Sequence, residues 1–103
     1  MGLGFNGAQL LGLAIGGCFC NDLRYTAEAM GVGLGKVSVT VTVELDGAPL
    51  LATKATMEVA CAMTDGSDPQ ALIERAKASC MMSNSLPRGI PVSVLAKERT
   101  GSA

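Results

Sequence analysis

The 103-residue sequence predicts one domain of the α+β class, with its elements in the order αββαβ. Three observations lead to this prediction. Apolar residues recur at helical spacing in the N-terminal third, and two runs of alternating residues follow on either side of an Asp-Gly pair. A second helical pattern then precedes a short apolar run near the C-terminus.

The first helix is predicted over residues 9–30, a segment rich in Ala, Leu and Met. Three glycines inside it lower its helix propensity, and we therefore expect close packing against another backbone. A cluster of glycines at residues 31–33 should end the helix, because glycine readily adopts the left-handed cap. The apolar residues at helical spacing are Leu11, Ala14, Ile15, Cys18 and Phe19, and the glycines are Gly12, Gly16 and Gly17.

An antiparallel hairpin is predicted next. Valine alternates with polar residues over residues 36–45, which is typical of a strand with one buried and one wet face. Asp46 and Gly47 then make a turn. In the second run, one face carries Met57, Val59, Cys61 and Met63, and the other carries Lys54, Thr56 and Glu58.

The second helix is predicted over residues 69–84, with Asp68 as its N-cap and Pro69 at its first position. Residues 87–89 should end it, and residues 91–97 are predicted to form a last strand. Residues 100–103 are expected to fray. The apolar face of this helix carries Leu72, Ile73, Ala76 and Cys80.

The composition excludes several functions. The absence of histidine excludes catalysis that depends on imidazole and excludes His-ligated zinc. Eight basic against nine acidic residues and only three aromatic residues make nucleic acid an unexpected partner. The longest apolar stretch, residues 8–20, is too short to cross a bilayer, so no membrane partner is expected. We expect a cytoplasmic protein whose four cysteines are free thiols.

The apolar content predicts self-association. Hydrophobic residues make up 49% of the chain and charged residues 17%. One hairpin and one further strand are too little sheet to cover a long first helix that is nearly devoid of charge. We therefore expect a homodimer in which these helices pair.

The four cysteines differ in what they can do. Cys61 is expected to be structural, and Cys18 and Cys20 lie about 200° apart around one helix, so they cannot share a bond or a metal. Without histidine or a second close cysteine pair, no metal site is expected. Cys18 and Cys80 become neighbours if the apolar faces of their helices pack together, although two unrelated core cysteines remain the alternative.

Two segments of the sequence resemble the OsmC/Ohr family, the osmotically induced and organic hydroperoxide resistance proteins. Residues 6–19, NGAQLLGLAIGGCF, resemble the family's "N-P-E-x-L-L-x-A-x-x-x-C-F" stretch, and residues 78–86, ASCMMSNSL, resemble its "C-P-x-S-N-A" motif. Arg88, Gly89 and Val92 continue the second match. The resemblance implies an OsmC-like fold with a long central helix, and an intertwined homodimer.

The same resemblance implies an activity without a cofactor, the thiol-dependent reduction of organic hydroperoxides. Cys18 would attack the peroxide as thiolate and form a sulfenic acid, Cys80 would condense with it, and an external dithiol would reduce the disulfide. The alternative is a non-catalytic dimer of the same fold that binds an apolar small molecule and uses its cysteines only for packing.

The sequence also departs from the family pattern. Residues 1–103 are expected to be a single OsmC-like domain that lacks the family's N-terminal strands and their activating arginine; a fragment completed by strands from elsewhere is a further possibility. Ala8 stands at the family's glutamate and Met81 at its proline. Arg88 is a better substitute cation than Arg24, and Asp22, one turn from Cys18, would raise the thiol pKa. The two thiols thus remain the candidate site.

Overall fold

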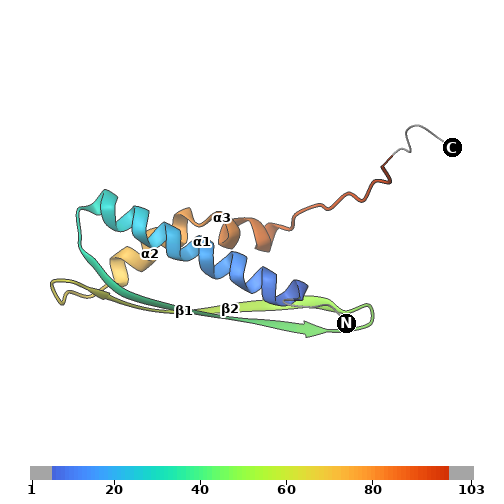
Figure 1. Cartoon of the computed structure of the whole chain (residues 1–103), viewed down its shortest axis with the longest axis horizontal. Coiled ribbons are helices and arrows are strands. Elements are labelled where there is room, and N and C mark those ends of the chain that lie inside the picture. Colours follow the sequence, from blue (N-terminus) through green and yellow to red (C-terminus); the bar gives the residue numbers. More distant parts are fainter. Residues whose placement is uncertain (1–5, 98–103) are drawn as a thin grey trace.

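The computed structural model, which describes residues 6–97, consists of a helical layer on one face of a long two-stranded hairpin (Figure 1). This mixed arrangement confirms the predicted α+β class. The elements are α1 (Gly7–Met30), β1 (Leu34–Asp46), β2 (Leu51–Met63), α2 (Gln70–Ser79), α3 (Met81–Ser85) and the 3-10 turn η1 (Leu86–Arg88).

Helix α1 begins two residues before the predicted start because Asn6 and Gln9 form a capping box. The Asn6 side chain accepts the Gln9 backbone N–H at 2.8 Å, and the Gln9 side chain accepts the Asn6 backbone N–H at 3.0 Å. Gly31 ends the helix in the left-handed conformation, with φ of 70°, and confirms the predicted end.

Two of the three glycines that the sequence placed inside the first helix allow α1 to approach β1 closely. A Cβ on Gly16 would lie 3.2 Å from Val41 Cγ2, and one on Gly12 would lie 3.7 Å from Val43 Cγ2. Gly17 has no such neighbour within 4 Å in the described chain. Close packing is therefore present at two positions, but it is made with valine side chains of the sheet and not with another backbone as expected.

The hairpin is confirmed with antiparallel register, for example Val39 opposite Val59 and Val41 opposite Met57. Its inward side chains are half-buried under α1, and its outward Ser and Thr side chains are exposed. The turn occupies residues 47–50, where Gly47 has φ of 93°. The alternation in the sequence thus identified the correct inner face of both strands.

The core lies between α1, α2 and the end of β2. Residues four apart on α1 form one buried stripe that packs against the apolar face of α2. The buried members of this cluster are Phe19, Leu23, Ala27, Met63, Leu72, Ala76 and Cys80.

The predicted start of the second helix is wrong by one residue. Helix α2 begins at Gln70, and Pro69, with ψ of 1°, precedes it in the place of the N-cap. The Asp68 carboxylate still accepts a backbone N–H from Gln70 at 2.9 Å. Asp68 therefore stabilises the first turn from one position further out than predicted.

The prediction of one continuous helix over residues 69–84 is also wrong. At Cys80 the backbone is extended, with φ of −70° and ψ of 114°, and α3 starts at the next residue. Ser79 Oγ donates to the carbonyl of Arg75 at 3.3 Å, and Asn84 Nδ2 donates to the carbonyl of Ala78 at 2.9 Å. These side chains satisfy carbonyls near the end of α2 and so stabilise the break.

The predicted last strand is not formed. Residues 91–97 run away from the helices and the hairpin (Figure 1) and pair with neither β1 nor β2. Val92, Val94 and Leu95 are 83%, 91% and 87% exposed. A strand needs a partner backbone, and this segment meets none among residues 6–97. The fraying expected at residues 100–103 lies outside the described residues.

The chain is more extended than a compact domain of its length. Its radius of gyration is 18.2 Å, whereas about 13 Å is typical of a compact chain of 100 residues. The projecting C-terminal segment and the long hairpin account for the difference. Between residues 6 and 97, no helix has the length and apolar character needed to cross a membrane.

Candidate functional site

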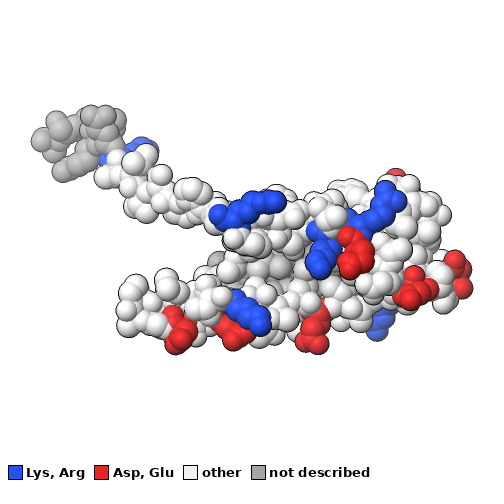
Figure 2. Space-filling view, turned by 180° about the vertical axis from the view of Figure 1, so that it is seen from behind, with Lys and Arg blue, Asp and Glu red and all other residues white. Residues whose placement is uncertain are grey.

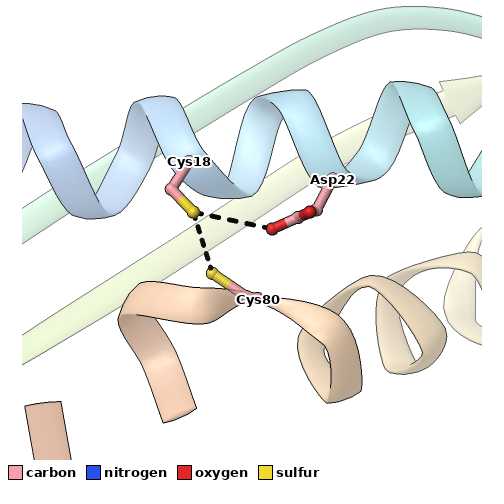
Figure 3. Close-up of side chains that lie close together, drawn as sticks. All are labelled: Cys18, Asp22 and Cys80. Carbon is pink, nitrogen blue, oxygen red and sulfur yellow. Dashed lines mark hydrogen bonds between the residues drawn. The ribbon is translucent and has the colours of Figure 1, made fainter. Parts of the chain in front are cut away.

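Two of the predicted site residues, Cys18 and Cys80, meet where α1 packs against the break between α2 and α3 (Figure 3). The Cys80 thiol donates to Cys18 Sγ across 3.7 Å, and both cysteines are free. The apolar faces of the two helices pack together, which is the condition under which the sequence made the two thiols neighbours. A disulfide bond requires about 2.05 Å between sulfurs, so the two sulfurs must move closer than their present 3.7 Å to form one.

Asp22 completes the cluster. It lies one turn after Cys18 on α1, and its Oδ2 accepts the Cys18 thiol at 3.7 Å (Figure 3). Cys80 is fully buried, whereas Cys18 and Asp22 are half-buried. Solvent therefore reaches the site from the α1 side, and Cys18 is the thiol that an incoming reagent meets first.

The pKa of the Cys18 thiol is raised above its ordinary value. The strongest influence, a hydrogen bond from the Met82 backbone N–H, lowers the pKa, but burial, the adjoining Cys80 and the charge of Asp22 together outweigh it. Each unit of the rise costs about 1.4 kcal/mol in forming the thiolate. The expectation that Asp22 raises the pKa is thus confirmed.

The break after α2 positions two groups of the site at once. It turns the Cys80 thiol towards α1, and it brings the Met82 N–H of α3 to the Cys18 sulfur. A continuous helix would use this N–H in its own backbone ladder. The role of Met82 was not predicted, because the helical spacing of Leu72, Ala76 and Cys80 continues through the break and hides it.

An apolar pocket lies between the helices and the hairpin, beside the thiols. Its volume is about 580 Å³. Figure 2 shows charged side chains scattered along both layers, with a largely uncharged recess between them. The pocket includes Ile15, one turn before Cys18, and Met82, whose N–H bonds to Cys18. Its lining also includes Leu11, Val43, Ala52, Thr53, Lys54, Ala55, Met57, Ser83, Leu86 and Pro87.

The other residues considered from the sequence lie apart from this cluster. Cys20 lines a hollow between α1 and β1, and Cys61 faces inward on β2, where burial raises the pKa of its thiol. Arg24 is exposed. Arg88 donates from Nη1 to the carbonyl of Asn84 at 3.0 Å, so its guanidinium is engaged within its own turn.

The cluster also has the donor atoms of a metal site. The two Sγ atoms and one carboxylate oxygen of Asp22 all lie within 4.8 Å of one another. Two thiols and a carboxylate suit a borderline divalent cation better than a hard one. The chemistry available here is therefore thiol oxidation, disulfide formation or cation binding.

Comparison with known proteins identifies the family. The model of the family described as OsmC-like protein matches residues 1–95. No curated protein matches the chain significantly. The chain is similar to a structure described as an organic hydroperoxide resistance protein OsmC, predicted redox protein and regulator of sulfide bond formation from Legionella pneumophila, with 28% identity and a TM-score of 0.63 over 81% of this chain.

A second similar structure is an OsmC-like hydroperoxide resistance protein from Jannaschia sp. CCS1, with 20% identity and a TM-score of 0.59 over 87% of this chain. The chain spans 62% of the first of these proteins and 63% of the second. The match to the family model covers nearly the whole sequence, including both cysteine motifs. The chain therefore belongs to the OsmC-like protein family.

Proposed function

We propose that this protein reduces organic hydroperoxides, with Cys18 as the thiol that attacks the peroxide and Cys80 as the thiol that resolves the product. The observation that carries the proposal is the 3.7 Å approach of two sulfurs whose cysteines lie 62 residues apart in the sequence. Membership of the OsmC-like family and the hydroperoxide resistance neighbours support a redox role of this kind.

The reaction has two steps. The Cys18 thiolate attacks the terminal oxygen of ROOH, the O–O bond breaks, and RO⁻ leaves and takes a proton to become ROH. Cys18 is then a sulfenic acid. The Cys80 thiol condenses with it to a disulfide and releases water, and an external dithiol reduces the disulfide by exchange. Each cycle oxidises one dithiol and reduces one hydroperoxide.

The half-buried position of Cys18 suits this order of events. Cys18 is open to an incoming peroxide, whereas Cys80 has no exposed surface and can meet only a partner that is already in the site. A resolving thiol in contact with the sulfenic acid also limits further oxidation to sulfinic acid. The asymmetry in burial therefore supports the two roles.

The apolar pocket supports an organic substrate. Its lining is mainly aliphatic and methionine side chains, and it includes Ile15, one turn before Cys18 on α1. Burying an alkyl or aryl group there stabilises the complex by about 25 cal/mol for each Å² of apolar surface. Hydrogen peroxide has no such group, so the pocket favours larger hydroperoxides.

We propose that residues 1–103 act as a single domain and that two copies form a homodimer in the cytoplasm, where dithiol reductants are available. Leu10 and Leu13 are 53% and 57% exposed on α1, and residues 91–97 project as an unpaired extended segment. A second copy would cover both features. Light scattering should give twice the chain mass, and Leu13→Lys should shift it towards the monomer.

Titration with an organic hydroperoxide tests the activity. One equivalent of cumene hydroperoxide should remove two thiols per reduced chain and yield one equivalent of the alcohol. Cys18→Ser should abolish the loss, and Cys80→Ser should leave a trappable sulfenic acid. Cys20→Ser and Cys61→Ser are matched controls that should react normally. A loss of thiols that persists in Cys18→Ser would sink the proposal.

The second candidate function is binding of an apolar small molecule without catalysis. The raised pKa of Cys18 and the pocket of about 580 Å³ favour it. In that case an apolar fluorescent probe should bind in the pocket, Leu11→Asp should abolish binding, and the hydroperoxide titration should consume no thiol. The two candidates therefore differ in the thiol count.

A further inference from the structure

We propose that reduced Cys18, Cys80 and Asp22 bind a divalent cation of the zinc class, with the two sulfurs and one carboxylate oxygen as its ligands. This goes beyond the proposed peroxidase function and does not depend on it. No metal site was expected from the sequence, which has no histidine and no two close cysteine pairs. The fold supplies instead the Cys18 thiol and the Asp22 carboxylate from α1, together with the Cys80 thiol from the break between α2 and α3.

The distances between the donor atoms fit such an ion. With metal–sulfur distances of about 2.3 Å and metal–oxygen distances of about 2.0 Å, tetrahedral geometry puts two sulfurs about 3.8 Å apart and a sulfur and an oxygen about 3.5 Å apart. The Cys18 and Cys80 sulfurs are 3.7 Å apart, and Cys18 Sγ is 3.7 Å from Asp22 Oδ2. The third pair lies within 4.8 Å, which a rotation of the Asp22 side chain can shorten.

The ligand set also selects the kind of cation. Two thiolates exclude Mg²⁺ and Ca²⁺, which take oxygen ligands, and the carboxylate disfavours Cu⁺, which takes soft ligands alone. Zn²⁺ and Cd²⁺ accept the mixed set. Because Cys18 and Asp22 are half-buried, solvent can supply the fourth ligand from their side.

A cation explains the position of Asp22 better than thiol chemistry does. Its Oδ2 lies 3.7 Å from Cys18 Sγ, where its negative charge repels a free thiolate. Bound to the same ion, the carboxylate and the thiolates attract a common positive charge and no longer oppose one another. Binding forms two metal–sulfur bonds and one metal–oxygen bond, and it releases the two thiol protons to solvent.

Binding and oxidation would exclude each other, because both use the same sulfur lone pairs. If the proposed peroxidase activity holds, a hydroperoxide takes two electrons from the two bound thiolates and two protons from solvent. The products are the disulfide, ROH, water and the free cation. The metal should therefore slow oxidation, and oxidation should release the metal.

The test is titration of the full, reduced and metal-free chain with Cd²⁺. Binding is monitored through the ultraviolet absorption band of cadmium–thiolate bonds. One ion per chain should bind, and Zn²⁺ should compete for the same site. Cys18→Ser should abolish the band, and Asp22→Asn should weaken binding by about tenfold or more. Cys20→Ser and Cys61→Ser, the matched thiol controls, should bind as the parent chain does.

Each result decides the proposal. Unchanged affinity in Cys18→Ser or in Asp22→Asn, or no saturable band in the parent chain, would overturn it. Because Cys80 is in the core, Cys18→Ser and Asp22→Asn serve as the main variants, with circular dichroism to check their folding. Hydroperoxide titration of the metal-free chain tests the peroxidase separately, so either hypothesis can fail alone.

Discussion

Removing the charge of Asp22 should lower the pKa of Cys18 and change its reactivity in opposite directions at low and high pH. The carboxylate oxygen lies 3.7 Å from the sulfur. At that distance the repulsion between carboxylate and thiolate is about 1 kcal/mol in water and about 4.5 kcal/mol at an effective dielectric constant of ~20. Both groups are half-buried, so we take the lower figure, which corresponds to about one pKa unit.

The expected rates follow from this shift. In metal-free Asp22→Asn, one unit gives about ten times more thiolate at neutral pH, while the lower basicity makes each thiolate about threefold less nucleophilic. Alkylation by iodoacetamide should therefore be about threefold faster than in the parent at pH 7, and about threefold slower at a pH above both midpoints. The two pH–rate curves should cross.

The assay needs a background of Cys20→Ser and Cys61→Ser, so that Cys18 is the one accessible thiol beside buried Cys80. Glu28→Gln is the matched control. It removes the same charge from an exposed position ten residues further along α1, which is about 15 Å along the axis and beyond the screening length at physiological salt. If Asp22→Asn and Glu28→Gln give the same midpoint, the electrostatic reasoning is refuted.

Three further predictions concern stability, each measured by denaturant unfolding of the reduced protein. Gly17→Ala should stabilise the chain by about 0.5–1 kcal/mol. Gly16→Ala should stabilise it less, because the new Cβ would lie 3.2 Å from Val41 Cγ2. Equal stabilisation by the two substitutions would contradict the packing of α1 on β1. Leu23→Ala should cost about 2–5 kcal/mol, because Leu23 is fully buried, and a loss below 1 kcal/mol would argue against this core. Burial raises the pKa of Cys61, so the folded state holds this proton more tightly than the unfolded chain does. The contribution of Cys61 to the free energy of unfolding should be complete below the ordinary thiol pKa of about 8.5, and it should be lost as the pH rises through the pKa of Cys61 in the folded state. Cys61→Ala should therefore lose less stability at high pH than the parent chain does.

The elements that could be predicted from the sequence are those whose pattern is local. The valine alternation identified the inner face of β1, and the glycines after Met30 marked the end of α1. The start of α1 was placed two residues late, because its capping box depends on Asn6 and Gln9 side chains outside the apolar pattern. Local periodicity and glycine conformation are thus sufficient for the long elements.

The two main errors lie where tertiary contacts override a local pattern. Leu72, Ala76 and Cys80 keep helical spacing, but the backbone leaves the helix at Cys80, where the side chains of Ser79 and Asn84 bond to carbonyls of α2. The apolar run at residues 91–97 suits a strand, yet no edge of the hairpin accepts it. Strand formation depends on a partner that the run itself does not specify.

The candidate site shows the same division between local and long-range information. Helical spacing placed Cys18 and Asp22 one turn apart. Cys80 was expected near them only if the apolar faces of the two helices pack together, as the structure shows that they do. The Met82 N–H could not be predicted, because it is free only where the helix breaks. This donor partly offsets the effect of Asp22, so the reactivity of Cys18 depends on a backbone feature as much as on its side-chain neighbours.

The position of Asp22 separates the functions that these thiols can have. A peroxide-reactive thiolate is stabilised by positive charge, yet the charged side chain in contact with Cys18 is a carboxylate. A cation bound to the three groups would stabilise the thiolates, because it binds them directly and the carboxylate attracts it. Asp22→Asn should therefore speed reaction of the free thiol at neutral pH and weaken metal binding. An aspartate that lies beside Cys18 without binding a metal would produce the first effect alone.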